Sequence, residues 1–275
     1  MFKILCPIDF SACSLNALYF AYFVHSKLER SSLHLINVQN DEASSGTFSD
    51  QILEMVEDEK YLDALHSFNE LASAEIGIKL NPMFSVVHSN DKVSDIINET
   101  IKEEDSDLIV MGTEGANQWK KKLLGSTTQN VLEKVKCHVM AVPKNAEFHG
   151  IQKLALAIDY MYFNKEAFDI AYLLRGIIAE HLHVFDVNIA NNPLMEEKLK
   201  EISLRYAATP NVIFSLVEAI EVVEGITKFI DRNPVDLLVL ISKKYSFLQR
   251  LFERSYTEEL ILHTKVPVLI LKLDE

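Results

Sequence analysis

The chain contains an internal repeat: five apolar segments of its first half recur, in the same order, in its second half. The matched pairs are KILCPID (3–9) with KLALAID (153–159), SLHLINV (32–38) with HLHVFDV (181–187), FSVV (84–87) with FSLV (214–217), DLIVM (107–111) with DLLVL (236–240), and KCHVMAV (136–142) with KVPVLIL (265–271). Self-similarity of this kind indicates a structural unit that occurs twice. We therefore expect two domains of one fold, at residues 1–146 and 150–275.

The repeated segments have the pattern of buried parallel strands, because they are short, apolar and bounded by polar residues. Apolar residues at helical spacing separate them, from Ala17 to Val24, over 53–71 and over 93–101, with Ser11 as the expected N-cap of the first helix. Strands that alternate with helices predict an α/β fold with a doubly wound parallel sheet in each half. The polar segment 39–52 predicts a loop, either a lid over a ligand or a plain surface loop.

A glycine pattern follows the fourth strand of the first half. Gly112 and Gly115 are followed by nine residues and then by Gly125 and Ser126, so the pattern is G-x-x-G, nine residues, G-[ST]. It is not a Walker A loop, because no lysine follows Gly125. Glycine permits positive φ angles and a close approach of the backbone to a ligand. A glycine-rich loop between a strand and a helix is a common phosphate site, and it lies at the sheet edge where Asp9 ends the first strand.

This pattern resembles the nucleotide-binding signature of the universal stress protein family. Residues 3–11, 33–38 and 129–143 also resemble that family's first strand, second strand, and last helix and strand, so the resemblance spans the first half of the chain. It implies the Rossmann-like fold of that family in two tandem copies. It also implies an adenine nucleotide as the ligand, ATP or AMP, with or without Mg²⁺.

The resemblance further implies which residues surround the nucleotide. The first strand would lie beside the adenine, with a carboxylate that accepts a hydrogen bond from the base, and the second strand would add an apolar wall. The fourth strand, the loop and the following helix would surround the ribose and the phosphates. These residues are Pro7, Ile8, Asp9, Val38, Met111, Gly112, Thr113, Gly115, Gly125, Ser126, Thr127 and Thr128.

The loop departs from the family pattern at two positions. Glu114 and Ala116 stand where relatives often carry a basic residue or histidine. Glu114 either faces the phosphates, which it would repel unless a divalent cation intervenes, or points to solvent. The run 120–122 of three lysines either contacts phosphate or is a solvated basic surface.

The second copy has lost the glycines of the loop. Ile241, Lys244 and Arg254 align with the three glycines, whereas Asp159 and Ser255 still match Asp9 and Ser126. Side chains at those positions block a close approach of the backbone, so we predict that the second domain is degenerate and binds no nucleotide in the family manner. Its basic residues, Lys243, Lys244, Arg250 and Arg254, either hold another anion or form a charged surface.

Assembly and location follow from the resemblance and the composition. The resemblance implies pairing through the last strands, here residues 138–142 and 267–271, so the two domains would form an intrachain pseudo-dimer; a further homodimer is an open alternative. A net charge of −13 argues against nucleic acid or an anionic membrane as a partner. The chain has no apolar run of roughly 18 residues, no secretory signal pattern at its start and only three cysteines, so we expect a cytoplasmic protein with free thiols.

Other chemistry has little support in the sequence. His181 and His183 alternate along a predicted strand and face one side, which suits either a metal with an unidentified third ligand or plain surface histidines. Three functions are therefore compared. The favoured one is a nucleotide-binding regulatory module of a stress response, read by an unidentified protein partner. The alternatives are a slow ATPase and a nucleotide-free dimerising scaffold.

Overall fold

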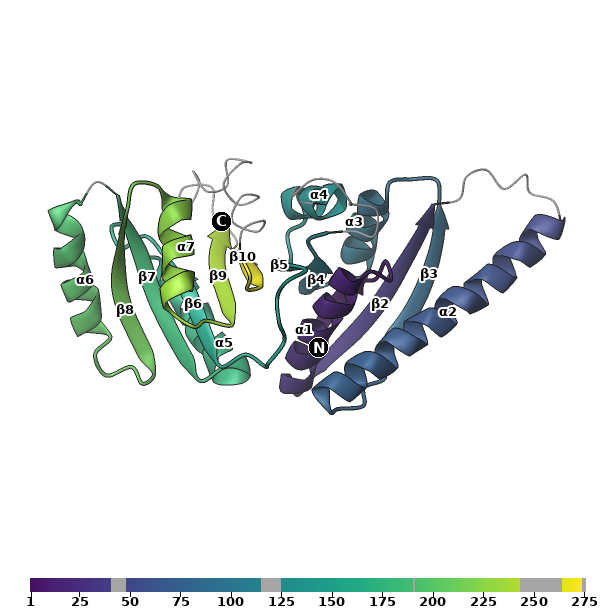
Figure 1. Ribbon diagram of the computed structural model, residues 1–275, viewed down its shortest axis with the longest axis horizontal. Coiled ribbons are helices and arrows are strands. Elements are labelled where there is room, and N and C mark those ends of the chain that lie inside the picture. Colours follow the sequence, from purple (N-terminus) through teal and green to yellow (C-terminus); the bar gives the residue numbers. More distant parts are fainter. Residues whose placement is uncertain (41–47, 115–124, 190, 243–263, 274–275) are drawn as a thin grey trace. The chain divides into compact units, whose positions relative to one another are not determined.

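The computed structural model describes residues 1–40, 48–114, 125–189, 191–242 and 264–273 (Figure 1). The chain divides into two compact units, residues 1–144 and 145–275. This division lies within a few residues of the expected domains, 1–146 and 150–275.

Strands and helices alternate along both units, as the repeat predicts. The first unit contains β1 (Phe2–Pro7), α1 (Ala12–Lys27), β2 (Ser31–Asn40), α2 (Phe48–Ile76), β3 (Met83–Ser89), α3 (Val93–Glu104), β4 (Leu108–Gly112), α4 (Ser126–Lys134) and β5 (His138–Val142). The second contains β6 (Lys153–Ala157), α5 (Lys165–Ile178), β7 (His181–Ile189), α6 (Pro193–Arg205), β8 (Val212–Ala219), α7 (Val222–Arg232), β9 (Leu237–Ser242) and β10 (Val268–Lys272).

Both units have the same strand order. The first is ordered β3-β2-β1-β4-β5 and the second β8-β7-β6-β9-β10, with every described pair within a unit parallel. Equivalent contacts recur as well: the backbone N–H of Lys3 donates to Asp107 Oδ2 at 2.8 Å, and that of Lys153 donates to Asp236 Oδ2 at 2.9 Å. The prediction of two doubly wound parallel sheets is confirmed. Pairing of the last strands across the units stays a prediction.

The core of the first unit lies against its sheet. Alternate strand residues face opposite sides, so Leu5, Ile109 and Val139 pack with Ile97 of α3 and Val131 of α4 on one side. On the other side α1 packs against β4 and against α2, which runs beside β3 (Figure 1). Each such side chain contributes roughly 1.5–3 kcal/mol when it is fully buried.

Two local predictions had different outcomes. Ser11 is the N-cap of α1, and its side chain accepts a hydrogen bond from the N–H of Ser14, as expected. The loop predicted over 39–52 is wrong at both ends: β2 continues through residue 40, and α2 begins at Phe48. The apolar spacing of 53–71 belongs to a helix that begins five residues earlier, at Phe48. A lid would involve 41–47, which lie outside the described residues.

Candidate functional site

The sheet of the first unit brings two predicted parts of the site together at one edge. β1 and β4 are parallel neighbours, with Ile4 opposite Leu108 and Leu5 opposite Ile109. β1 continues the sheet through β2 and β4 continues it through β5, so the strand order reverses between β1 and β4. In such sheets a crevice forms outside the carboxyl ends of the strands at that point. Asp9 follows β1, and Gly112 ends β4.

The turn after β1 holds the first predicted residues. Pro7 is the half-buried last residue of β1, and Ile8 is buried, with its N–H donating to the carbonyl of Ile36 at 2.8 Å. Asp9 is exposed, and its Oδ1 accepts the N–H of Ser11 at 3.0 Å. The carboxylate therefore has a defined position at the ligand edge of the sheet.

Phe10 makes this turn unusual. Its φ of 60° lies in the left-handed region, which a bulky residue seldom adopts. The Phe10 ring stacks on Tyr61 at a centroid distance of 6.1 Å and meets Phe68 edge-on at 5.4 Å. Both partners belong to α2, so packing against that helix stabilises the strained residue next to Asp9. Strain of this kind concentrates at functional sites.

Asn37 links the end of β2 to the turn after β1 by a hydrogen bond. The sequence analysis did not predict this role. Its side chain is only 1% exposed, and its Nδ2 donates to the carbonyl of Ile8 at 2.7 Å. The neighbouring Val38 is half-buried, on the strand that pairs with β1. The repeat contained a sign of it: Asp186 aligns with Asn37, so both copies have a polar residue within an otherwise apolar strand.

Gly112 is required by the packing of α1. A Cβ built on Gly112 would lie 2.8 Å from Cys13 Sγ and 3.1 Å from the Cys13 carbonyl carbon and oxygen. The first turn of α1 therefore lies directly on the end of β4. We expected the loop glycines to supply positive φ angles. Among the described residues, the glycines with positive φ are Gly77 and Gly150, so neither Gly112 nor Gly125 has that role.

The start of α4 completes the edge. Gly125 is its N-cap with a φ of −56°, and the Gly125 N–H donates to the carbonyl of Thr113 at 2.9 Å. Gly125 has no side chain that could cap the helix, and among the described residues no other side chain does so. The first N–H groups of a helix have no partner within the helix, and the helix dipole makes this end attractive to anions. Ser126 is exposed and Thr127 half-buried at this end.

The remaining predicted residues have structural roles that limit what they can offer a ligand. Thr128 is 2% exposed, and its hydroxyl donates to the carbonyl of Gly112 at 2.9 Å, which ties α4 to the end of β4. Thr113 is buried, with its N–H on the carbonyl of Val142 at 3.0 Å. The side chain of Met111 belongs to the core, so its backbone is the part at the edge. Gly115, Ala116 and the lysine run lie outside the described residues.

The two thiols near this edge are poor nucleophiles. Burial raises the pKa of Cys13, although the backbone N–H groups of Glu114 and Thr113 act in the opposite direction. Burial also raises the pKa of Cys6 strongly. A neutral thiol is a weak nucleophile, so the geometry offers anion binding rather than cysteine chemistry.

Comparison with known proteins decides the family. The family model described as "Universal stress protein family" matches residues 1–143 and 179–272. The chain belongs to the universal stress protein family. No curated protein matches the chain.

Solved structures of similar fold cover either nearly the whole chain of this universal stress protein or about half of it. A universal stress protein from Archaeoglobus fulgidus is 20% identical over 98% of this chain and 96% of its own, with a TM-score of 0.70. A functionally unknown protein from Pseudomonas aeruginosa is 18% identical over 98% and 92%, with a TM-score of 0.66. A universal stress protein in complex with cAMP is 23% identical over 51% of this chain and 96% of its own, with a TM-score of 0.40.

The second unit of this universal stress protein has a different edge. Ile241 stands at the position of Gly112, the last residue of β4, and is buried. Asp159 and Asp186 are both buried and line a cavity of about 170 Å³. The Oδ2 of Asp186 accepts the N–H of Tyr160 at 2.7 Å, and Asp159 Oδ1 accepts the N–H of Met161 at 2.8 Å.

Both carboxyl groups hold their protons more tightly than usual. Desolvation by burial is the main cause for Asp186, the nearby charge of Asp159 adds to it, and the pKa of Asp186 rises to about 7. Burial raises the pKa of Asp159 as well. The second unit therefore differs from the first in having two buried acids, rather than an exposed Asp9 and an amide, at the ends of its first two strands. The aligned positions of Lys244, Arg254 and Ser255 lie outside the described residues.

The paired histidines of β7 have no third metal ligand among the residues that the structure describes. His181 is exposed, whereas the Nε2 of His183 lies 2.9 Å from Ser215 Oγ, and the His183 ring meets Phe229 edge-on at 4.7 Å. Within the described ranges, no group of three or more His, Cys, Asp or Glu side chains is placed to hold a metal ion. Among the described residues, no helix is both long enough and apolar enough to span a membrane.

Proposed function

We propose that the first unit binds one adenine nucleotide, ATP or AMP. Occupancy of this site regulates the binding of a cytoplasmic partner protein to the surface around it, as part of a stress response. The observation that carries the proposal is the N-terminus of α4, which no described side chain caps, beside the adjacent ends of β1 and β4. Asp9 lies at the end of β1, and Ser126 and Thr127 begin α4. An anion at the helix start and a base beside Asp9 would use both parts of this edge.

Single occupancy of the chain is part of the proposal. The second unit keeps an aspartate at the end of its first strand, but Ile241 stands in place of Gly112. The buried side chain of Ile241 hinders the close backbone approach that a glycine permits, which supports one nucleotide per chain rather than two.

A regulatory module is favoured over an enzyme. Hydrolysis needs a general base within hydrogen-bond reach of the attacking water. Asp9 is expected at the adenine end of the site. In the described part of the loop, the carboxylate that remains as a candidate general base is Glu114, which is half-buried. The alternative of slow ATP hydrolysis would be favoured by turnover in purified protein that a phosphate-site variant removes.

The direct test is the nucleotide content of the purified protein. Protein prepared without added nucleotide is denatured, and the released material is identified and quantified by chromatography. We expect about one adenine nucleotide per chain, or one site on calorimetric titration with ATP or AMP, with and without Mg²⁺. Two nucleotides per chain would contradict the degenerate second unit. No uptake under any of these conditions would leave the scaffold as the function.

Ser126→Asp is expected to separate binding from folding. The new carboxylate lies at the first residue of α4, where it repels a phosphate, so nucleotide affinity should fall at least tenfold, equivalent to about 1.4 kcal/mol. The same charge interacts favourably with the helix dipole, so thermal stability should be unchanged or rise by about 0.3–1 kcal/mol. Asn130→Asp, one turn further along α4, is the matched control and should retain affinity within about twofold. Equal losses in both variants would contradict a phosphate at the helix start.

A further inference from the structure

The ring of Phe10 connects the predicted nucleotide site to α2, a helix of 29 residues. Phe10 follows Asp9 directly in the turn after β1, and its φ of 60° fixes the direction in which the turn continues. Asp9 Oδ1 accepts the N–H of Ser11, so the carboxylate keeps its place only while the turn keeps this conformation. The ring partners of Phe10 are Tyr61 and Phe68, so α2 is the element that holds the turn.

The internal repeat shows that the fold does not require this conformation. Tyr160 aligns with Phe10, after the same Ile-Asp pair, and it does not belong to the described residues with positive φ. Its side chain is buried within the second unit, where the hydroxyl donates to the carbonyls of Val184 at 2.9 Å and Ser215 at 3.0 Å. A left-handed residue at this turn is therefore a feature of the first unit, where the ring packs on α2 instead.

Ring and apolar contacts attach α2 to the sheet. Besides the two rings on Phe10, His66 packs on Phe84 of β3 with ring centroids 4.4 Å apart, and Leu65 is buried. Across residues 59–76, whose side chains the structure describes, no hydrogen bond or ion pair joins α2 to a strand. Apolar contact has no preferred direction, so it tolerates small displacements of a helix that hydrogen bonds would resist.

The helices that pack together on this side of the sheet, α1 and α2, bury three polar atoms that lack a hydrogen-bond partner of normal geometry. These atoms are Tyr22 Oη on α1 and Asn69 Oδ1 and Ser73 Oγ on α2. Buried polar atoms nearly always have partners, and those without one lower stability. The docked position of α2 is therefore less stable than that of a helix with all its polar atoms paired.

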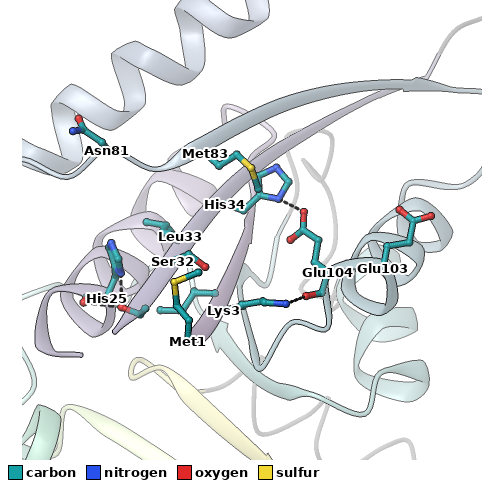
Figure 2. A pocket seen from close by; sticks show the side chains of 12 residues that line it. Met1, Lys3, His25, Ser32, Leu33, His34, Asn81, Met83, Glu103 and Glu104 are labelled. Carbon is teal, nitrogen blue, oxygen red and sulfur yellow. Dashed lines mark hydrogen bonds and ion pairs between the residues drawn. The ribbon is translucent and has the colours of Figure 1, made fainter. Parts of the chain in front are cut away.

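α3 is attached to the same sheet in a different way. At the edge opposite the nucleotide site, Lys3 Nζ donates to the backbone carbonyl of Glu104 at the end of α3 (Figure 2). His34 Nδ1 lies 2.6 Å from the carboxylate of the same glutamate. These polar contacts fix α3 to the beginnings of β1 and β2. A displacement at the nucleotide site is therefore transmitted to α2 more easily than to α3.

We propose that Phe10 is a positioning residue that couples Asp9 to α2, and that the position of α2 reports whether the nucleotide site is occupied. This inference rests on the proposed function, in which the base lies beside Asp9. A base that binds Asp9 stabilises the turn and, through it, the packing of Phe10 on α2. Coupling between two sites is reciprocal, so displacement of α2 lowers the affinity for the base by the same factor. A partner protein that contacts α2 would distinguish the occupied state from the empty one.

Nuclear magnetic resonance of the protein without nucleotide tests the link from α2 to the turn. The backbone chemical shifts of Phe10 report its φ. Phe68→Ala should move them toward ordinary values, because the edge-on ring contact is lost. Phe84→Ala is the matched control and should leave them unchanged, since it removes a half-buried phenylalanine ring that lies against His66 of the same helix. Unchanged shifts in Phe68→Ala, or equal changes in both variants, would overturn the coupling.

Hydrogen exchange with and without AMP tests the link from the site to α2. Saturating AMP should slow exchange in peptides from 59–76 at least threefold in the natural protein, and should not slow it in Phe10→Ala at concentrations that saturate this variant. Equal slowing in both proteins, or none in the natural protein with AMP bound, would overturn the inference. Absence of AMP binding to the natural protein is instead a failure of the proposed function, and the chemical shifts of Phe10 then decide whether α2 holds the turn.

The choice of base separates positioning from general packing. Purine riboside 5′-monophosphate lacks the amino group of AMP, which is the donor that Asp9 would accept. The natural protein should bind AMP at least tenfold more tightly than this analogue, and Phe10→Ala less than threefold more tightly. Phe10→Gly should keep more of the preference than Phe10→Ala, because glycine adopts a φ of 60° without strain. An equal preference for AMP in the natural protein and Phe10→Ala would show that Phe10 does not position Asp9.

Discussion

Asp186→Asn is expected to remove a pH dependence from the stability of the second unit. The Asp186 carboxyl has a folded pKa of about 7 against an ordinary value of 3.8. Between these values the folded state binds more protons than the unfolded state, so the free energy of unfolding falls as pH rises from about 4 to about 7. Below that window Asp186 is protonated in both states and causes no loss. Above it the charged group is buried, and the loss is complete.

The size of the effect follows from the difference between the two pKa values. Each pKa unit corresponds to about 1.4 kcal/mol, so the stability of the natural protein relative to Asp186→Asn should change by roughly 4 kcal/mol across the window. Asparagine resembles the protonated acid, with one oxygen that can accept the N–H of Tyr160 or Val187. Any loss of the second hydrogen bond is independent of pH. It therefore shifts the whole curve of the variant and leaves the slope difference intact.

Hydrogen exchange at several pH values measures the stability of each structural unit separately. Peptides from β6 and β7 report on the second unit, and peptides from β1 and β2 serve as the internal reference. Asp231→Asn, an exposed change on α7, should leave the pH profile unchanged. A profile in which Asp186→Asn parallels the natural protein from pH 4 to 8 would show that the buried carboxyl is not the source.

Gly225→Ala is expected to destabilise the second unit by up to about 2 kcal/mol. A Cβ at this position of α7 would lie 2.4 Å from Val187 Cγ1 and 2.7 Å from Val187 Cγ2. Val187 is buried on β7 and is stiff at χ1, so it cannot rotate away cheaply. Overpacking of this kind costs about 1–3 kcal/mol. The helix propensity of alanine recovers about 1 kcal/mol of that.

Gly176→Ala is the matched control, because it makes the same change in a helix of the same unit. Nothing lies within 4 Å of a Cβ at Gly176, so this variant should be more stable by about 0.5–1 kcal/mol. Urea unfolding of both variants gives the comparison, and Val187→Ala provides the test of cause. In a double-mutant cycle, Gly225→Ala should be less harmful in the Val187→Ala background by at least about 1 kcal/mol. Additive effects would mean that the contact with Val187 is not responsible.

The candidate site was predictable in part. The glycine pattern and the strand that precedes it identified the edge, because a strand, a glycine loop and a helix start have a recognisable order in sequence. The role of Gly112 was not predictable, because its partner Cys13 is distant in the chain and meets it only through the packing of α1 on β4. The contact of Phe10 with α2 was also missed. Its partners, Tyr61 and Phe68, are distant in the chain, and nothing in their spacing indicates that they meet Phe10.

The sequence by itself determined the two-unit organisation, the alternation of strands and helices, and the family. These depend on local periodicity and on the order of segments, which are properties of the chain alone. The tertiary structure decided what each side chain faces. Asn37 and Asp186 occupy equivalent strand positions, yet one donates to a carbonyl and the other accepts an N–H beside a second buried acid. Hydrogen bonding, burial and raised pKa values arise between distant residues, so they are determined only when the sheet has brought those residues together.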